Sequence, residues 1–294
     1  MRFPVFIALC LAFTACGGSR AQSGAGTLSP SAPTTRILLS AAGARPSAAL
    51  AALVNSAGQS PVRVLVLSAG ADTVSGPSAA ADLRTAGAIA SSIRLTRTMA
   101  ESGQISSLLG GTQAVWLTGT NARELGAALG GTATAVALER RARAGMPIGG
   151  DGAGAGILAS VLITGGDVPP PRRRNARPAD DDGVATGEGL GVLLGTLVYA
   201  PASTRHKPDA LASALETHPR IVGIQLDSGA ALRVQSDGVW ESVGTTDVLI
   251  LVPDTEISPD TAGAIARRTR ILSPGSRFDP RTRALLPLQP AEGR

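Results

Sequence analysis

Short apolar runs alternate with helix-like stretches along the first half of the chain. Runs that are apolar on both faces are typical of strands in a parallel sheet, which is covered by helices on both sides. The runs that predict strands are 36–40, 62–67, 93–96, 114–118 and 146–149. The stretches that predict helices are 46–55, 78–91, 100–109, 122–129 and 132–144. This alternation predicts an α/β fold in three layers, with a mostly parallel sheet flanked by helices.

The second half of the chain has shorter apolar runs joined by turn residues. A helix is expected over about 153–163, and a disordered loop over about 165–188, where prolines, arginines and aspartates gather. The later elements expected are a strand at 189–199, a helix at 208–217 and short strands at 221–226, 231–235, 239–243 and 247–252. Turns such as Ser236-Asp237-Gly238 favour added β-hairpins beside the parallel sheet.

The amino terminus has the pattern of an export signal. Residues 1–15 combine Arg2, a short apolar segment and small residues, which is typical of a signal peptide. Cys16 follows directly, as in a bacterial lipobox, and is the candidate lipidation site; an ordinary signal peptide with an incidental cysteine is the alternative. Residues 16–35 then form a flexible tether, 36–288 one α/β domain, and 289–294 a tail. We expect export to the bacterial cell envelope, lipid-anchored on the periplasmic or outer-membrane face, or secretion.

Composition excludes several kinds of site. The chain has two cysteines and two histidines, so once the leader is removed no disulfide is expected, and no metal site. The net charge of +5 comes from arginine, since Lys207 is the only lysine. The arginines at 172–174 are followed by aspartates at 180–182 without aromatic residues between them, which does not favour nucleic-acid binding. The membrane is expected as a partner only through the lipid anchor, and the oligomeric state stays open.

The most informative segment is 148–155, Ile-Gly-Gly-Asp-Gly-Ala-Gly-Ala. It has the frame of a nucleophile elbow, the strand-to-helix turn G-x-S-x-G, but Gly152 stands where the serine belongs. Asp151 is expected to hydrogen-bond the amides of the turn itself. The segment also fits the dinucleotide fingerprint G-x-G-x-x-[GA], but it follows about the fifth strand, and Asp167 precedes a proline-rich loop. No cofactor is therefore expected.

Five motifs in order give the chain a family resemblance. From about residue 36 to 288 it resembles cyanophycinase and the related dipeptidase E-type serine peptidases, which share the class I glutamine amidotransferase-like fold. The motifs that carry the resemblance are Trp-Leu-Thr-Gly-Thr-Asn at 116–121, the elbow at 148–155, Gly-Leu-Gly-Val-Leu-Leu at 189–194, Gly-Ile-Gln-Leu-Asp at 223–227 and Leu-Ser-Pro-Gly-Ser-Arg-Phe-Asp at 272–279.

The resemblance implies a Ser-His-Glu triad, and this chain departs from it at every position. Gly152 takes the place of the serine, Pro201 that of the histidine and Ser228 that of the glutamate. The glutamine that lines the family's substrate pocket falls on Ala122. Without nucleophile, base and orienting acid, the resemblance implies a family member that is inactive as a serine hydrolase.

Three interpretations of the function follow. The first is binding of a peptide or carboxylate ligand at the old cleft, with Asn121, Asp151, Gly152, Ala153 and Arg205 as candidate contacts. The second is a hydrolase with relocated catalytic groups, for which His206 and Asp227 are a candidate pair, although His206 between Arg205 and Lys207 is more typical of an exposed loop. The third is an envelope interaction module whose cleft is vestigial.

Overall fold

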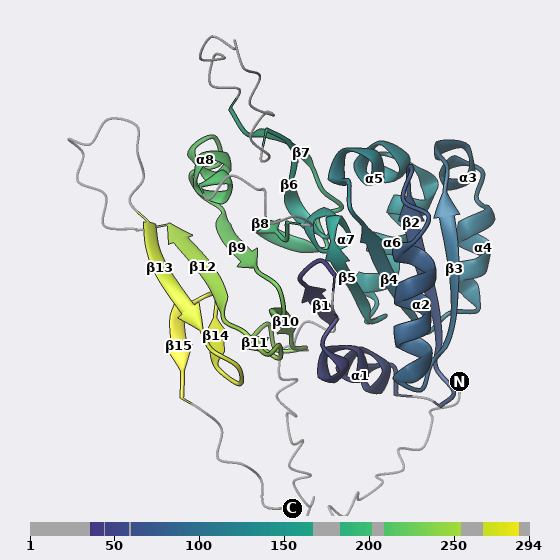
Figure 1. Cartoon of the computed structure of the whole chain (residues 1–294), viewed down its shortest axis with the longest axis horizontal. Helices are drawn as coiled ribbons and strands as arrows, with labels where there is room; N and C mark the ends of the chain where they lie inside the picture. Colours follow the sequence, from purple (N-terminus) through teal and green to yellow (C-terminus); the bar gives the residue numbers. More distant parts are fainter. Residues whose placement is uncertain are drawn as a thin grey trace, which may run out of the picture. The chain divides into compact units, whose positions relative to one another are not determined.

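The computed structural model describes residues 36–43, 45–58, 60–166, 183–201, 209–253 and 267–287. All of them belong to one compact unit, Ala32–Arg294 (Figure 1). The expected signal peptide, Cys16, the tether, the tail, and Arg205, His206 and Lys207 lie outside the described residues.

The larger sheet has nine strands in the order β15-β14-β11-β10-β1-β5-β4-β2-β3. Its parallel part consists of β1 (Ile37–Ser40), β5 (Ile148–Gly152), β4 (Ala114–Gly119), β2 (Arg63–Ala69) and β3 (Ile89–Leu95). Antiparallel strands extend it: β10 (Ala231–Val234), β11 (Trp240–Ser242), β14 (Arg277–Asp279) and β15 (Ala284–Leu286). The predicted parallel strands and the hairpin at Gly238 are therefore confirmed.

Helices cover both faces of this sheet. Alternate residues along each strand point to opposite faces, so each face has its own core. Val64 and Val66 pack with α1 (Ser47–Ser56) and α2 (Ser75–Thr85). Leu65 and Leu67 share the other core with the helices that follow along the chain. Those helices are α3 (Arg97–Glu101), α4 (Gln104–Gly110), α5 (Ala122–Leu129), α6 (Ala133–Arg143) and α7 (Ala153–Ile157). The three-layer α/β architecture is thus as predicted.

A second sheet of six strands has the order β13-β12-β9-β8-β6-β7. It is parallel across β6 (Ala159–Gly165), β8 (Leu193–Tyr199) and β9 (Val222–Leu226). The antiparallel strands are β7 (Ala185–Glu188), β12 (Val248–Pro253) and β13 (Arg267–Leu272). The helix α8 (Ala210–Glu216) shares a small core with Leu197 and Tyr199.

The helix predicted over 153–163 is wrong beyond its first turns. The helix α7 stops at Ile157, and Ala159–Gly165 forms β6. Val161 and Ile163 are β-branched, which favours a strand. Both pair with β7, and Val161 also pairs with β8. Residues 185–188, expected within a disordered loop, form β7.

Two further boundaries differ from the predictions because of glycines. The helix α2 ends at Thr85, and Gly87 at φ 92° turns the chain so that Ile89–Ser91, expected to be helical, begin β3. The helix expected over 100–109 is divided into α3 and α4 at Gly103, which has φ 73°.

Candidate functional site: an elbow without a nucleophile

The strand β5 ends in a sharp turn at Gly152. This residue has φ 55° and ψ −122°, and α7 begins at the next residue, Ala153. That region of φ and ψ is accessible to glycine and strained for any residue with a Cβ. The strand-to-helix turn predicted from the sequence is therefore present, at the carboxyl-terminal edge of the parallel strands.

Small residues in this segment allow close backbone packing. A Cβ at Gly150 would lie 2.5 Å from the carbonyl oxygen of Gly154, and a Cβ at Gly154 would lie 1.9 Å from that of Leu117. These distances are too short for any residue with a Cβ. Glycine at 150 and 154 therefore allows the start of α7 to pack closely on β5 and β4.

The place of a nucleophile's side chain is crowded. A Cβ on Gly152 would lie 2.8 Å from the carbonyl oxygen of Gly119 and 3.1 Å from the Cβ of Ala42. Gly119 ends β4, and Ala42 follows β1, so both neighbouring strands converge on this point. A serine here would require backbone movement.

Asp151 has different partners from those expected. Its carboxylate accepts a hydrogen bond from Trp116 Nε1 at 2.7 Å, and it lies 3.0 Å from Arg45 Nη2. The Arg45 guanidinium also lies 2.8 Å from Asp82 on α2, and it donates to Thr118 Oγ1 at 3.4 Å. The expectation that Asp151 hydrogen-bonds the turn's own amides is corrected: Trp116 from β4 and Arg45 from the segment after β1 hold it instead.

The centre of this cluster is buried, and Asp82 at its edge is 44% exposed. The side chains of Arg45 and Asp151 are 4% and 5% exposed. Burial raises the pKa of the Asp151 carboxyl, against the opposing effects of Arg45, Thr118 and Trp116. The effect of burial outweighs these opposing interactions. The cluster is suited to fixing the elbow rather than to contacting a ligand.

Sequence reasoning missed Arg45, although a signal for it was present. Asp151 ends a strand that is apolar elsewhere, and a buried carboxylate needs a cation or donors. In a parallel sheet, the segment after the neighbouring strand β1 reaches the same edge. Arg45 is the first cation of that segment.

The other predicted contacts are only partly brought together. Asn121 lies just beyond β4, but its side chain caps α5 by accepting a hydrogen bond from the Glu124 amide at 3.1 Å. Ala153 is buried directly after Gly152, and Ala122 is the first residue of α5. Arg205 lies outside the described residues.

The remaining triad positions lie at the ends of strands in the second sheet. Pro201 follows β8 and is half-buried. Ser228 is exposed in the turn after β9, where its carbonyl accepts a hydrogen bond from Thr246 Oγ1. Asp227 accepts a hydrogen bond from Gln225 Nε2 at 3.1 Å. Its suggested pairing with His206 involves a residue outside the described part of the chain.

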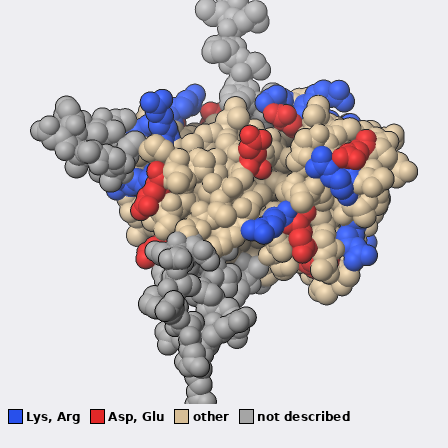
Figure 2. Space-filling view, turned by 90° about the horizontal axis from the view of Figure 1, so that it is seen from above, with Lys and Arg blue, Asp and Glu red and all other residues tan. Residues whose placement is uncertain are grey.

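Within the described residues, no group of histidines, cysteines and carboxylates has the arrangement of a metal site. Nor does any helix of this part of the chain have the length and apolarity needed to span a membrane. On the face seen in Figure 2, acidic and basic side chains are interspersed among uncharged ones.

Comparisons with known proteins agree with the family resemblance of the sequence. The profile of Peptidase family S51 matches residues 77–241, more than half of the chain. This chain belongs to Peptidase family S51. Cyanophycinases from Nostoc sp. and from Trichormus variabilis are each 27% identical over 201 residues, which make up 65% of this chain and 65% of the relative. The chain thus spans about two thirds of the length of these relatives.

A solved structure supports the fold. The crystal structure of a peptidase from an acI-B1 actinobacterium matches with a TM-score of 0.62 and 18% identity. The match covers 83% of this chain and 96% of that protein. At this identity the likeness concerns the architecture alone, and it confirms the α/β peptidase fold implied by the resemblance.

Proposed function

We propose that this chain is a non-hydrolytic member of Peptidase family S51. One observation carries the proposal: the elbow keeps a conformation of φ 55° and ψ −122°, but the residue in it is Gly152. Glycine has no side-chain atom that can attack a carbonyl. The turn is therefore retained without its nucleophile.

The aligned triad positions support the same proposal. Pro201 has no group that accepts a proton from a nucleophile, and Ser228 carries no charge that would orient a base. A serine hydrolase needs a base to activate its hydroxyl. Restoring only one of the three groups would leave the others missing.

For the remaining role we propose binding of a peptide or carboxylate, by an exported protein anchored through Cys16. The contacts would come from the amide of Ala153 and from Arg205. Asp151 and Asn121 contribute less, because their side chains already have partners. Asp151 is held by Arg45 and Trp116, and Asn121 accepts a hydrogen bond from the Glu124 amide.

Hydrolysis is the direct test. The purified chain is expected not to release product from cyanophycin or from aspartyl dipeptides above background, and not to react with a fluorophosphonate probe. A cyanophycinase with an intact serine, assayed in parallel, shows that substrates and probe are competent. Turnover that persists through purification and is lost on changing Asp227 would instead support a hydrolase with relocated groups.

The crowding at Gly152 favours a second candidate, an envelope interaction module with a vestigial cleft. The carbonyl oxygen of Gly119 and the Cβ of Ala42 crowd the position that the Cβ of a nucleophilic residue would occupy. Thermal-shift measurements with peptides and small carboxylates separate the two candidates. Stabilisation that is lost on bulky substitution of Ala42 supports binding at the old cleft, and no stabilisation supports the interaction module.

A further inference from the structure

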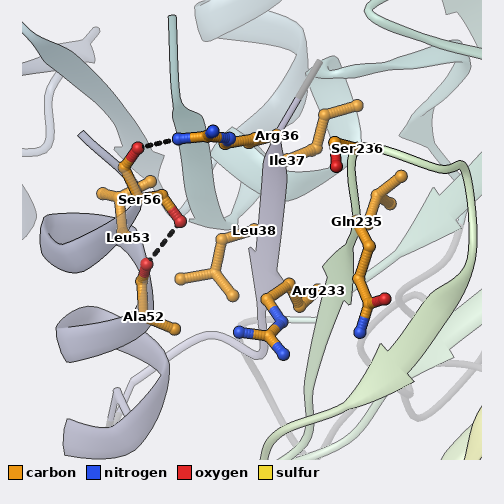
Figure 3. Close-up of a pocket in the computed structure, with 10 residues that line it drawn as sticks. Arg36, Ile37, Leu38, Ala52, Leu53, Ser56, Arg233, Gln235 and Ser236 are labelled. Carbon is orange, nitrogen blue, oxygen red and sulfur yellow. Dashed lines mark hydrogen bonds between the residues drawn. The ribbon is translucent and has the colours of Figure 1, made fainter. Parts of the chain in front are cut away.

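A pocket of about 300 Å³ lies between α1, β1 and β10 (Figure 3). It is at the amino-terminal end of β1, around Arg36–Leu38, whereas the elbow lies at the carboxyl-terminal ends of the strands. Such a volume is at the lower end of the range of small-molecule sites. The pocket is therefore separate from the old cleft and independent of the proposed function.

The strand register explains why a hollow forms here. Leu38 of β1 is directly opposite Arg233 of β10, so both side chains lie on the face of the sheet that α1 covers. Ala52 and Leu53 of α1 stand over this pair. The short Leu38 side chain beside the long Arg233 side chain leaves space under α1. Figure 3 shows the Leu38 and Arg233 side chains projecting into this space.

The pocket combines an apolar floor with cations at its rim. Leu38 and Leu53 are each 2% exposed, and they form the floor. Arg36 and Arg233 line the same pocket, and Gln235 adds an amide. Such a pairing of apolar surface with few polar groups is typical of sites for small organic anions.

Arg36 Nη1 donates a hydrogen bond to the carbonyl of Ser56 (Figure 3), and Arg233 retains an unused donor. Arg233 Nη2 lies 2.5 Å from Glu241 Oε2, and the same oxygen accepts a hydrogen bond from Gln235 Nε2 at 2.6 Å. One carboxylate thus serves two side chains. Arg233 Nε is buried without a hydrogen-bond partner among the described residues. A buried unpaired donor indicates that an acceptor is missing, and a guanidinium offers five N–H groups.

We propose that this pocket binds a small carboxylate with a short hydrocarbon part. The carboxylate accepts hydrogen bonds from Arg233 and Arg36, and the hydrocarbon part packs on Leu38 and Leu53. Arginine suits this role because its planar fork matches a carboxylate with two parallel hydrogen bonds.

Calorimetric titration of the purified chain with hexanoate tests the proposal. Saturable binding with one site per chain is expected, with weaker binding of 1-hexanol, which lacks the charge, and of inorganic phosphate, which lacks the hydrocarbon part. Equal binding of hexanol would reduce the site to an apolar cavity, and absence of saturable hexanoate binding would overturn it. Phosphate binding as tight as hexanoate would also contradict the proposed amphipathic ligand.

Variants locate the binding. Arg233→Gln combined with Glu241→Gln keeps a neutral cross-strand pair, and it should weaken hexanoate binding about tenfold, as expected for losing a charged hydrogen bond. Ala52→Phe should fill the pocket and abolish binding. If the phenylalanine unfolds the chain, the smaller Ala52→Leu replaces it in the same test. Arg143→Gln on the exposed surface of α6 removes an arginine elsewhere and should leave the affinity unchanged. Equal affinity in all variants would place the binding outside this pocket.

Discussion

A serine at position 152 would destabilise the folded state, because it would have to adopt the backbone conformation that Gly152 has there. With φ 55° and ψ −122°, the backbone there is strained for a residue with a Cβ, by about 1–3 kcal/mol. In an active hydrolase that strain positions the nucleophile. Once hydrolysis is no longer selected, glycine relieves it, in line with the usual exchange of activity for stability.

Gly152→Ala and Gly152→Ser should both destabilise the chain by roughly 1 kcal/mol or more. The cause is positive φ together with the 2.8 Å approach of a Cβ to the Gly119 oxygen. Gly87→Ala is the matched control, since Gly87 has φ 92° but no atom within 4 Å of a Cβ. Chemical denaturation should give a larger loss at 152 than at 87, and Gly152→Ser should not restore hydrolysis. A neutral Gly152→Ala would mean that this turn is not an elbow.

Asp151 makes the stability of the chain depend on pH in a defined direction. Its pKa is raised in the folded state, chiefly by burial. As pH rises above about 4, the unfolded chain loses this proton before the folded chain does, so unfolding is favoured. The contribution of the protonated carboxyl is present at low pH and is lost as pH rises through the folded-state pKa. The free energy of unfolding, measured relative to Asp151→Asn, should therefore fall as pH rises above about 4. A difference that rises over this range would contradict the assignment.

At the residue scale, the sequence located the elbow and its missing nucleophile but not what surrounds them. Gly152 was identifiable because the glycine spacing is local. Arg45 was not, because its contact with Asp151 depends on β1 and β5 being neighbours although they are far apart in the chain. Asn121 was expected at the cleft edge, and only the structure shows that its side chain caps α5.

At the element scale, Arg45 joins three parts of the fold: the segment after β1, the end of β5 and the helix α2. Asp151 and Arg45 are both almost fully buried, so neither can find a substitute partner in water. The cluster ties α2 to the strand that carries the elbow.

Arg45→Met should therefore destabilise the chain by about 3 kcal/mol or more, because it leaves the Asp151 carboxylate buried without a cation. Adding Asp151→Asn should recover part of the loss, since the amide oxygen still accepts the Trp116 hydrogen bond. Arg143→Met removes an arginine from the exposed pair with Glu139, and it should cost less than about 1 kcal/mol. The measurement is urea denaturation of the variants. If the two single variants lose equal stability, the Arg45 cluster has no special role in holding the fold.

The elements that the sequence predicted are those whose apolar pattern is local and strong. The strands β1, β2, β4 and β5 are buried on both faces. The helix α5 was found with its observed limits because Asn121 caps it and Gly130 ends it. The strand β6 was missed since it follows a glycine-rich turn without a break in apolar character. The strand β13 was missed for another reason: its sequence, Arg-Arg-Thr-Arg-Ile-Leu, is polar, and only pairing with β12 makes it a strand.

At the scale of the whole molecule, the function that we propose keeps the architecture of a Peptidase S51 domain without its hydrolytic chemistry. The buried residues of the strands and helices form the core, whereas positions 152, 201 and 228 lie at or just beyond the ends of strands. Fold and activity can therefore separate, because sites are carried by a few residues on a scaffold that many residues stabilise.

Anchoring through Cys16 gives the last prediction. If Cys16 is acylated, the mature chain carries hydrocarbon chains, each contributing about 0.8 kcal/mol per buried CH₂ to membrane binding. The full chain, expressed in a bacterium that processes lipoproteins, should then partition into the detergent phase with the membrane fraction. Cys16→Ala should lose acylation and move to the aqueous phase, whereas Cys10→Ala, within the expected signal peptide, should behave as the unmodified chain does. Equal partitioning of all three would show that the segment is an ordinary signal peptide, and it would leave the protein without the anchor that we propose.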